Sequence, residues 1–184
     1  MDNGAGSYRR FLDGDDSGIV EIIRDYKDGL TLYLNGYVRN IFTAEELMEE
    51  TFFRLMTKKP HFKGKSSFRT WLYAIGRNTA TDYLRKQSKY TAQNEMNDEA
   101  TAEEYDVEKA YLKEESKIRL FKAMKRIRPE YEQVLYLTFF EGCTNEQAAS
   151  VMKKNRRQIE NLVYRAKKAL KAELEREDFT YEGL

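Results

Sequence analysis

Apolar side chains recur at steps of three and four residues along most of this chain. The pattern runs over residues 19–41, 47–55, 68–83, 118–139 and 159–174. Such spacing places the apolar groups on one face of an α-helix. Residues that interrupt helices are scarce, because the 184 residues include only 2 Pro and 10 Gly. We therefore predict an all-α protein, since sandwiches and barrels need more turn residues.

Local signals indicate the helix ends in the first half. The stretch Thr43–Glu46 has the form of a capping box, in which a hydroxyl and a carboxylate bond to free N–H groups at the start of a helix. Pro60 stops that helix and opens a short basic loop. Ser66 or Ser67 can cap the next helix, which we expect to reach about Lys86.

The second half contains a pattern typical of a helix-turn-helix motif. Upstream of it, Pro129 and Gly142 mark the two ends of another helix. A capping box at Thr144–Gln147 predicts a short helix, and Asn155–Gln158 predicts the start of a long one after the turn at Lys153-Lys154. In this motif the second helix lies in the DNA major groove with its N-terminal residues at base edges. For this segment taken alone, an ordinary helical hairpin with a solvated face is the alternative.

The formal net charge of +1 conceals strong charge segregation. Residues 53–90 carry 10 basic and 1 acidic side chains, and residues 151–171 carry 8 basic and 1 acidic. Residues 94–115 carry 2 basic and 9 acidic side chains and few apolar ones, a composition that cannot offset the entropy of ordering. Two basic blocks indicate two surfaces for a polyanion, and lysines and arginines that only solvate helix faces are the alternative. We predict two small helical domains at residues 1–87 and 113–184 and a flexible acidic linker at residues 88–112.

The rarity of Cys and His excludes much of enzyme chemistry. The chain has 1 Cys, Cys143, and 1 His, His61, so neither an internal disulfide nor a zinc site of Cys and His ligands can form. Gly64-Lys65-Ser66 imitates the end of a phosphate-binding loop, but Lys59 stands where that motif requires Gly and no strand precedes it. We expect no enzyme activity, no cofactor, no metal site and no small-molecule substrate.

No segment is suited to a membrane or to secretion. The apolar runs are far shorter than the roughly 20 residues that span a bilayer. The stretch Met1–Asp16 lacks the apolar core of a signal peptide. We expect a cytoplasmic protein without a membrane span.

Longer motifs stand in both halves of the chain. In the first half they are Ala44–Phe52, Phe62–Leu72, Gly76-Arg77-Asn78 and Asp82–Arg85, and in the second they are Pro129–Tyr131, Phe140-Glu141-Gly142 and Tyr164–Leu170. The first set resembles region 2, a helical bundle, and the second resembles region 4, a helix-turn-helix domain, of bacterial RNA polymerase sigma factors of the extracytoplasmic-function (ECF) group. The resemblance implies a protein that binds core RNA polymerase and directs promoter-specific transcription initiation.

The resemblance also implies three sets of functional residues. A helix of region 2 docks on core polymerase, the loop and helix that follow it hold the opened minus-ten strand, and the last helix of region 4 reads the minus-thirty-five element. The core-binding set is Glu46, Leu47, Glu49, Glu50 and Phe53. The minus-ten set is Phe62, Lys63, Gly64, Lys65, Ser66, Ser67, Arg69, Arg77, Asn78, Arg85 and Lys86. The minus-thirty-five set is Asn155, Arg156, Arg157, Gln158, Glu160, Asn161, Tyr164, Arg165 and Lys168.

Two features depart from the family pattern. Lys153-Lys154 occupies a turn where relatives commonly have Gly, and a left-handed Lys costs roughly 1–2 kcal/mol. Glu160 stands where many relatives carry a basic residue. An autonomous helix-turn-helix regulator that binds duplex DNA alone, and a polymerase-binding decoy without promoter use, are the alternative functions. An anti-sigma factor that clasps both domains is a further candidate partner.

Overall fold

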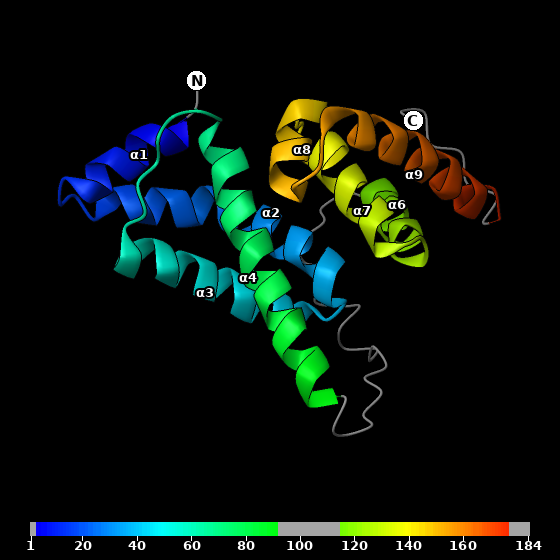
Figure 1. Ribbon diagram of the computed structural model, residues 1–184, viewed down its shortest axis with the longest axis horizontal. Helices are drawn as coiled ribbons and strands as arrows, with labels where there is room; N and C mark the ends of the chain where they lie inside the picture. The colour runs from blue at the N-terminus through cyan, green and yellow to red at the C-terminus, as the bar shows by residue number, and fades with distance from the viewer. Residues whose placement is uncertain (1–2, 92–114, 177–184) are drawn as a thin grey trace. The chain divides into compact units, whose positions relative to one another are not determined.

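The computed structural model describes residues 3–91 and 115–176, and the regular structure within these ranges is helical throughout, which confirms the all-α prediction. The chain divides into two compact units, Met1–Glu99 and Ala100–Leu184 (Figure 1). The first unit contains α1 (Asn3–Leu12), α2 (Ser17–Val38), α3 (Ile41–Lys58) and α4 (Phe68–Thr91). The second unit contains α6 (Glu115–Arg126), α7 (Pro129–Leu135), the π-helical turn η1 (Tyr136–Phe140), α8 (Asn145–Met152) and α9 (Arg156–Arg176). None of the helices in the described ranges has both the length and the apolarity that a bilayer crossing requires.

In the first unit α2 lies between α1 and α3, and α4 packs across α2 and α3 (Figure 1). Leu30 of α2, Leu55 of α3 and Leu72 of α4 are fully buried among these helices. Gly76 on α4 permits a close approach to α2, because a methyl group there would lie 2.8 Å from Leu30 Cδ1. Each fully buried leucine contributes roughly 1.5–3 kcal/mol. This interior therefore fixes α3 and α4, the two helices that carry the predicted sites of this unit.

The helix expected over residues 19–41 is broken before its end. Arg39 takes a left-handed conformation, with φ 53°, and Asn40 is extended. The Asn40 side chain accepts a hydrogen bond from the backbone N–H of Thr43 at 2.8 Å, which makes Asn40 the N-cap of α3. The predicted capping box at Thr43–Glu46 is therefore wrong, because the backbone already leaves the helical conformation at Asn40 and α3 starts directly after it.

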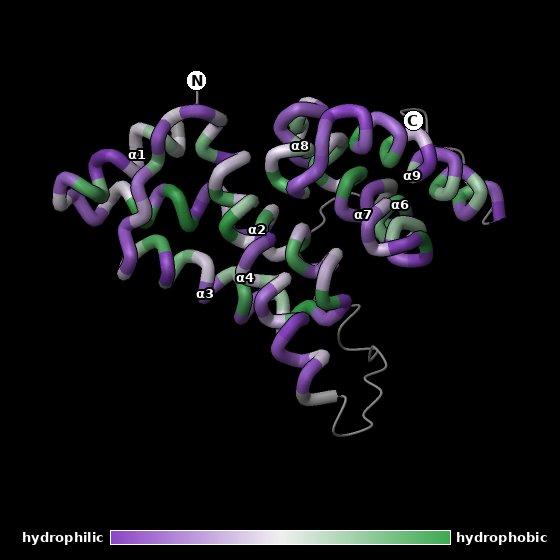
Figure 2. The backbone as a smooth tube through the Cα atoms, in the orientation of Figure 1, coloured by the Kyte–Doolittle hydropathy of each residue, from purple (hydrophilic) through white to green (hydrophobic). Residues whose placement is uncertain are grey.

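Helix α4 continues to Thr91 rather than ending near Lys86. Residues 85–89 are all exposed, so they give no apolar periodicity from which this extension could be predicted. The tube in Figure 2 accordingly turns hydrophilic along this end of α4. The remainder of the predicted linker, residues 92–112, lies outside the described residues.

Helix α1 has no counterpart among the predicted helices. Its buried apolar side chains include Tyr8 and Phe11, a stripe too short to stand out as a period. A methyl group at Gly18 of α2 would lie 2.1 Å from the carbonyl oxygen of Ser7, so the two backbones are in direct contact there. Helix α1 is thus an integral part of the first unit.

Both capping boxes predicted for the second unit are confirmed. Thr144 Oγ1 accepts a hydrogen bond from Gln147 N at 3.2 Å, and Gln147 Oε1 accepts one from Thr144 N at 2.8 Å. Asn155 and Gln158 exchange the equivalent two bonds at 2.8 Å each. Lys153, in the turn between the helices, is left-handed with φ 53°. Helices α8 and α9 therefore form a helix-turn-helix motif in which local side chains fix the start of each helix.

A π-helical turn interrupts the helix expected between Pro129 and Gly142. Pro129 occupies the first turn of α7 and Gly142 is left-handed with φ 62°, both as predicted. Between them Glu141 N donates to Tyr136 O at 3.1 Å, five residues back. Phe139 in this turn is 42% exposed. An apolar spacing that assumes about 3.6 residues per turn does not predict such a turn.

Candidate polymerase and nucleic-acid interfaces

The 59–67 loop joins α3 to α4. It carries the predicted minus-ten residues from Phe62 to Ser67. Gly64 holds a left-handed conformation with φ 67°, which costs little in a residue without a Cβ atom. Lys63, Gly64 and Lys65 are exposed. The backbone at Gly64 is therefore open to close approach by another group, with a positive charge on either side.

The end of this loop is fixed by Ser67. Its Oγ atom accepts a hydrogen bond from Thr70 N at 3.1 Å and lies 2.8 Å from Thr70 Oγ1. Of the two predicted caps for this helix, Ser67 is the one that forms. Ser66 is half-buried beside it, and its hydroxyl has only a long contact, 3.4 Å, to the carbonyl oxygen of Ser67.

Four aromatic rings, which we call the aromatic platform, support the 59–67 loop. The Phe62 ring centroid lies 5.1 Å from that of Trp71 and 5.7 Å from that of Phe68. Tyr8, from α1, lies 5.3 Å from Trp71 and 5.6 Å from Phe68. Phe68 is fully buried, whereas Phe62 and Trp71 are half-buried. The platform therefore gives the loop a packed base and two partly exposed rings on which a planar group can stack.

The polar residues of α4 do not all share one side. With about 3.6 residues per turn, Arg85 and Asn78 lie about 80° and 100° to one side of Arg77, and Lys86 lies opposite Arg77. Arg85 is exposed and donates to Asp82 at 2.9 Å. Arg69 lies opposite Asn78, and its guanidinium is 5.9 Å from the centroid of the Tyr26 ring on α2. The five predicted minus-ten residues on α4 are thus spread around the helix.

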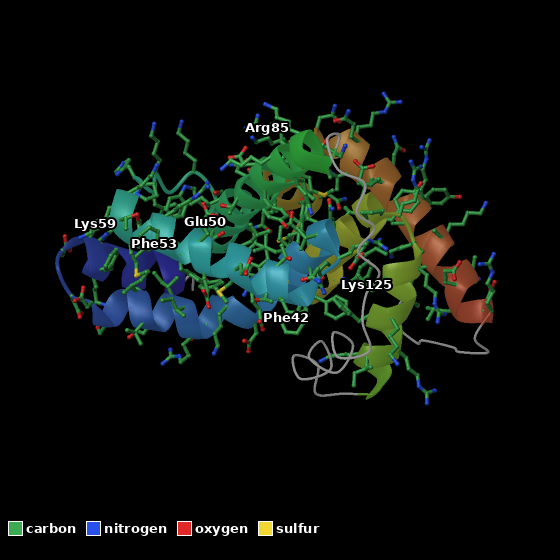
Figure 3. All side chains as sticks on the ribbon, turned by 90° about the horizontal axis from the view of Figure 1, so that it is seen from below. Phe42, Glu50, Phe53, Lys59, Arg85 and Lys125 are labelled. Carbon is green, nitrogen blue, oxygen red and sulfur yellow. The ribbon has the colours of Figure 1, made fainter. Side chains whose placement is uncertain are left out.

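The outer face of α3 is acidic with an aromatic ring near each end, and we call it the acidic face. Glu46, Glu49 and Phe53 are exposed at helical spacing, with Phe53 60% exposed. Glu50 is also exposed and accepts from Arg54 of the next turn at 2.5 Å. Figure 3 shows Phe53 and Phe42 toward opposite ends of α3, with Glu50 between them.

Two residues change the core-binding set that the sequence predicts. Leu47 is only 3% exposed and packs in the interior of the first unit, so it holds α3 in place and cannot touch a partner while the unit is folded. Phe42, which the predicted set omits, is 47% exposed and lies on the same side of α3 as Glu46 and Phe53. Phe42 stands four residues before Glu46 and eleven before Phe53, a helical spacing that already indicated this shared side.

On α9 a row of polar side chains, which we call the reading stripe, faces away from the core. Ile159, Leu162, Ala166 and Leu170 are buried on the inner side of the helix. The reading stripe consists of Arg157, Asn161, Tyr164, Arg165 and Lys168, all exposed, with Tyr164 71% exposed. Within residues 3–91 and 115–176 the side chains of these five residues make no hydrogen bond or ion pair. They are therefore available to an external partner.

The other four predicted minus-thirty-five residues are engaged within the unit. Asn155 and Gln158 hold each other in the capping box of α9. Arg156 donates to Glu146 of α8 and to Glu160, each at 2.7 Å. These bonds raise the pKa of Arg156, through the hydrogen bond to Glu160 first and the charge of Glu146 next. The pKa of Glu146 is lowered, chiefly by a hydrogen bond from its own backbone N–H and also by Arg156. This cluster ties α8 to the start of α9.

Comparison with known proteins matches both units to one family. The family profile described as Sigma-70 region 2 matches residues 22–90, and the profile described as Sigma-70, region 4 matches residues 117–170. The RNA polymerase sigma factor YlaC of Bacillus subtilis is 27% identical over 155 residues, which cover 83% of this chain and 90% of YlaC. The ECF RNA polymerase sigma factor BldN of Streptomyces coelicolor is 30% identical over 161 residues, which cover 85% of this chain and 60% of BldN.

The fold is also similar to that of solved sigma factors. The sigma factor RpoE of Bartonella quintana, solved in complex with the anti-sigma factor NepR, matches with a TM-score of 0.67 at 17% identity, over 84% of this chain and 95% of RpoE. The chain belongs to the sigma-70 family, as an RNA polymerase sigma factor of the ECF group. Sigma factors are non-enzymatic initiation factors that direct core RNA polymerase to promoters. Neither an autonomous regulator nor a decoy is favoured, because the regions for polymerase and promoter are both present.

Proposed function

We propose that the two units divide promoter recognition between them. The 59–67 loop and the Arg77 side of α4 hold the opened minus-ten strand. The reading stripe of α9 contacts the minus-thirty-five element in duplex DNA. The acidic face of α3 binds core RNA polymerase. The observation that carries this proposal is the reading stripe. Its five exposed polar side chains, which have no hydrogen-bond or ion-pair partner among the described residues, stand on the second helix of a helix-turn-helix motif.

The chemistry of the reading stripe suits the major groove. Arg157 and Asn161 stand in the first two turns of α9, the part of a recognition helix that approaches base edges. Arginine pairs with guanine, and asparagine with adenine, through two hydrogen bonds each. Arg165 and Lys168, further along, suit phosphate contacts that set the register on the duplex.

The 59–67 loop suits a base that has left the stack. A flipped base needs a pocket that its plane can stack against, together with polar groups near its edge. Phe62 supplies a partly exposed ring, and Gly64 lets the base approach the backbone. The hydroxyl of Ser66 supplies a polar group. Arg77 and Arg85 on α4 then offer charges for the phosphates of the same strand.

The acidic face of α3 suits a basic and partly apolar partner surface. Its carboxylates give charge complementarity, which favours fast association and rejects acidic surfaces. The exposed rings of Phe42 and Phe53 supply apolar area of the type enriched at interface centres. A core polymerase surface with basic residues around an apolar centre fits this description.

The protein contributes binding energy rather than catalysis in this proposal, and it acts in the cytoplasm, where the polymerase works. An anti-sigma factor is a further proposed partner, because solved relatives such as RpoE are held by one. Such a partner would compete for the acidic face or for the reading stripe.

The proposal is tested by run-off transcription with core polymerase and a library of promoters. We expect the full chain to direct initiation at a subset of templates that share an upstream and a downstream element. Glu46→Lys combined with Glu49→Lys should abolish core binding, whereas Asp28→Lys, at an exposed position on α2, should not. Failure of the chain to bind core, or to initiate on any template, would refute the proposal.

A further inference from the structure

Helix α1 meets the 59–67 loop although 52 residues separate the two contacting positions. Tyr8 Oη donates a hydrogen bond to the carbonyl oxygen of Pro60 at 2.8 Å. Beside it, the ammonium of Lys59 lies 4.7 Å from the centroid of the Phe11 ring. Both contacts fall on the first two residues of the loop, so α1 sets the direction in which the chain leaves α3.

Tyr8 is well suited to hold this position. Its side chain is 1% exposed, and burial raises its pKa to about 12, so the hydroxyl remains a donor at neutral pH. Pro60 has no N–H, and its carbonyl follows Lys59, whose backbone is left-handed with φ 41°. A single buried hydroxyl therefore fixes the carbonyl just past the point where the backbone turns.

Helix α1 also packs tightly against the aromatic platform. A methyl group at Gly4 would lie 2.3 Å from Phe68 Cδ1 and 2.8 Å from the hydroxyl of Tyr26. The Tyr8 ring contacts Phe68 and Trp71, the two rings that also contact Phe62. A displacement of α1 would therefore move the support of Phe62 as well as the start of the loop.

We propose that α1 is a positioning element for the minus-ten site, in which Tyr8 anchors the loop at Pro60 and completes the platform beneath Phe62. The loop is then preformed before DNA arrives, and an extruded base meets a ready surface instead of having to order one. The match to Sigma-70 region 2 begins at residue 22, so α1 lies outside the matched segment. This inference rests on the proposed function of the 59–67 loop.

The first test removes one hydroxyl and keeps the ring. The probe is the non-template oligonucleotide that the wild-type holoenzyme selects from a randomised pool. Tyr8→Phe should weaken binding of this oligonucleotide to the holoenzyme by about 3- to 10-fold, the range for one lost hydrogen bond, and should leave core affinity unchanged. Tyr33→Phe is the matched control, because Tyr33 is equally buried and its hydroxyl lies 2.9 Å from that of Tyr37 on the same helix.

The second test moves α1 without touching Tyr8. Gly4→Ala introduces the clash with Phe68, whereas Gly6→Ala makes the same exchange on the same helix with no atom within 4 Å. Trp71 is the only tryptophan of the chain, so its fluorescence in the isolated full chain reports on the platform alone. Acrylamide quenching of Trp71 should increase in Gly4→Ala and in Tyr8→Phe, and should stay at the wild-type level in both controls.

The outcomes separate positioning from mere stability. Equal losses of oligonucleotide affinity in Tyr8→Phe and Tyr33→Phe, or no loss in either, would overturn the inference while leaving the proposed function intact. Unchanged quenching in Gly4→Ala with intact oligonucleotide binding would also overturn it. A wild-type holoenzyme that selects no oligonucleotide would refute the proposed function, and this inference with it.

Discussion

The reading stripe and the 59–67 loop, the two surfaces proposed to meet promoter DNA, are built in different ways. The reading stripe stands on one helix, and the start of that helix is fixed by its own residues Asn155 and Gln158. The loop keeps its shape through rings from α1 and α4. A surface on one capped helix can be altered one side chain at a time. A surface shared among several elements changes whenever one of its supports changes.

Phe62→Ala should have the largest effect, because it removes both a stacking surface and a support of the loop. Stacking of a base on an aromatic ring is worth about 1–3 kcal/mol, and each lost ring contact within the platform costs a further ~0.5–1.5 kcal/mol. Strand opening, followed by permanganate reactivity of the minus-ten thymines, should fall steeply at constant core binding. Phe62→Tyr keeps the ring and should open promoters nearly as well as wild type. A comparable defect in Phe62→Tyr would show that Phe62 does not act by stacking.

Arg157→Ala comes next, because it tests the single-helix surface directly. Loss of a two-bond contact to guanine costs about 1–3 kcal/mol and relaxes sequence preference at one base pair. Selection of upstream elements by the holoenzyme measures this change. Arg157→Lys keeps the charge but not the planar pair of donors, so it should lose preference and retain most of the affinity. An unchanged preference in both variants would place base recognition elsewhere on α9.

Asn155→Ala and Asn161→Ala form a matched pair that separates folding from recognition on α9. Loss of the N-cap should destabilise the second unit by ~1 kcal/mol, seen as a lower unfolding temperature. Asn161 has no partner within the described residues, so its removal should leave the unfolding temperature unchanged and weaken only promoter binding. If Asn161→Ala destabilised the unit as much as Asn155→Ala, the stripe would be structural and not free.

Glu160→Gln should have the smallest effect, and it should raise promoter affinity, whereas the other variants lower promoter binding or stability. It releases one of the two carboxylates that hold Arg156, an exposed ion pair of the kind that contributes little to stability. Promoter affinity should rise slightly, and its dependence on salt should steepen as Arg156 gains a phosphate contact. Glu175→Gln removes the same charge fifteen residues further along α9 and should change neither quantity. Weaker binding in Glu160→Gln would mean that Glu160 itself contacts DNA.

Much of the fold follows from short-range patterns in the sequence. Features that depend only on residues within a turn or two of each other were predicted correctly. They are the capping boxes at Thr144 and Asn155, the helix signals Pro129 and Gly142 on either side of the π-helical turn, and the buried face of α9. The break between α2 and α3 could not be predicted from the sequence, because Asn40 and Thr43 are both acceptable N-cap residues for α3. Which of them acts is decided by where α2 ends, at Arg39.

The candidate sites were less predictable, because they depend on contacts between distant residues. The apolar spacing of residues 47–55 already points Leu47 toward the interior, and only the resemblance placed it among the core-binding residues. Nothing local shows that Arg156 is held by Glu146 across the turn. The role of Tyr8 is invisible in the sequence, since its partner Pro60 lies 52 residues away. The reading stripe could be predicted more fully because it needs only the period of one helix.

The described residues include three non-glycine positions with a left-handed backbone, Arg39, Lys59 and Lys153, and each follows the end of a helix. A positive charge there gains about 0.3–1 kcal/mol from the helix dipole, less than the roughly 1–2 kcal/mol that a left-handed residue with a Cβ atom costs. Glycine at Arg39 or Lys153 would relieve that strain. Such a substitution would raise the unfolding temperature without any change to the interior. Each one would also remove a positive charge from a protein that binds a polyanion.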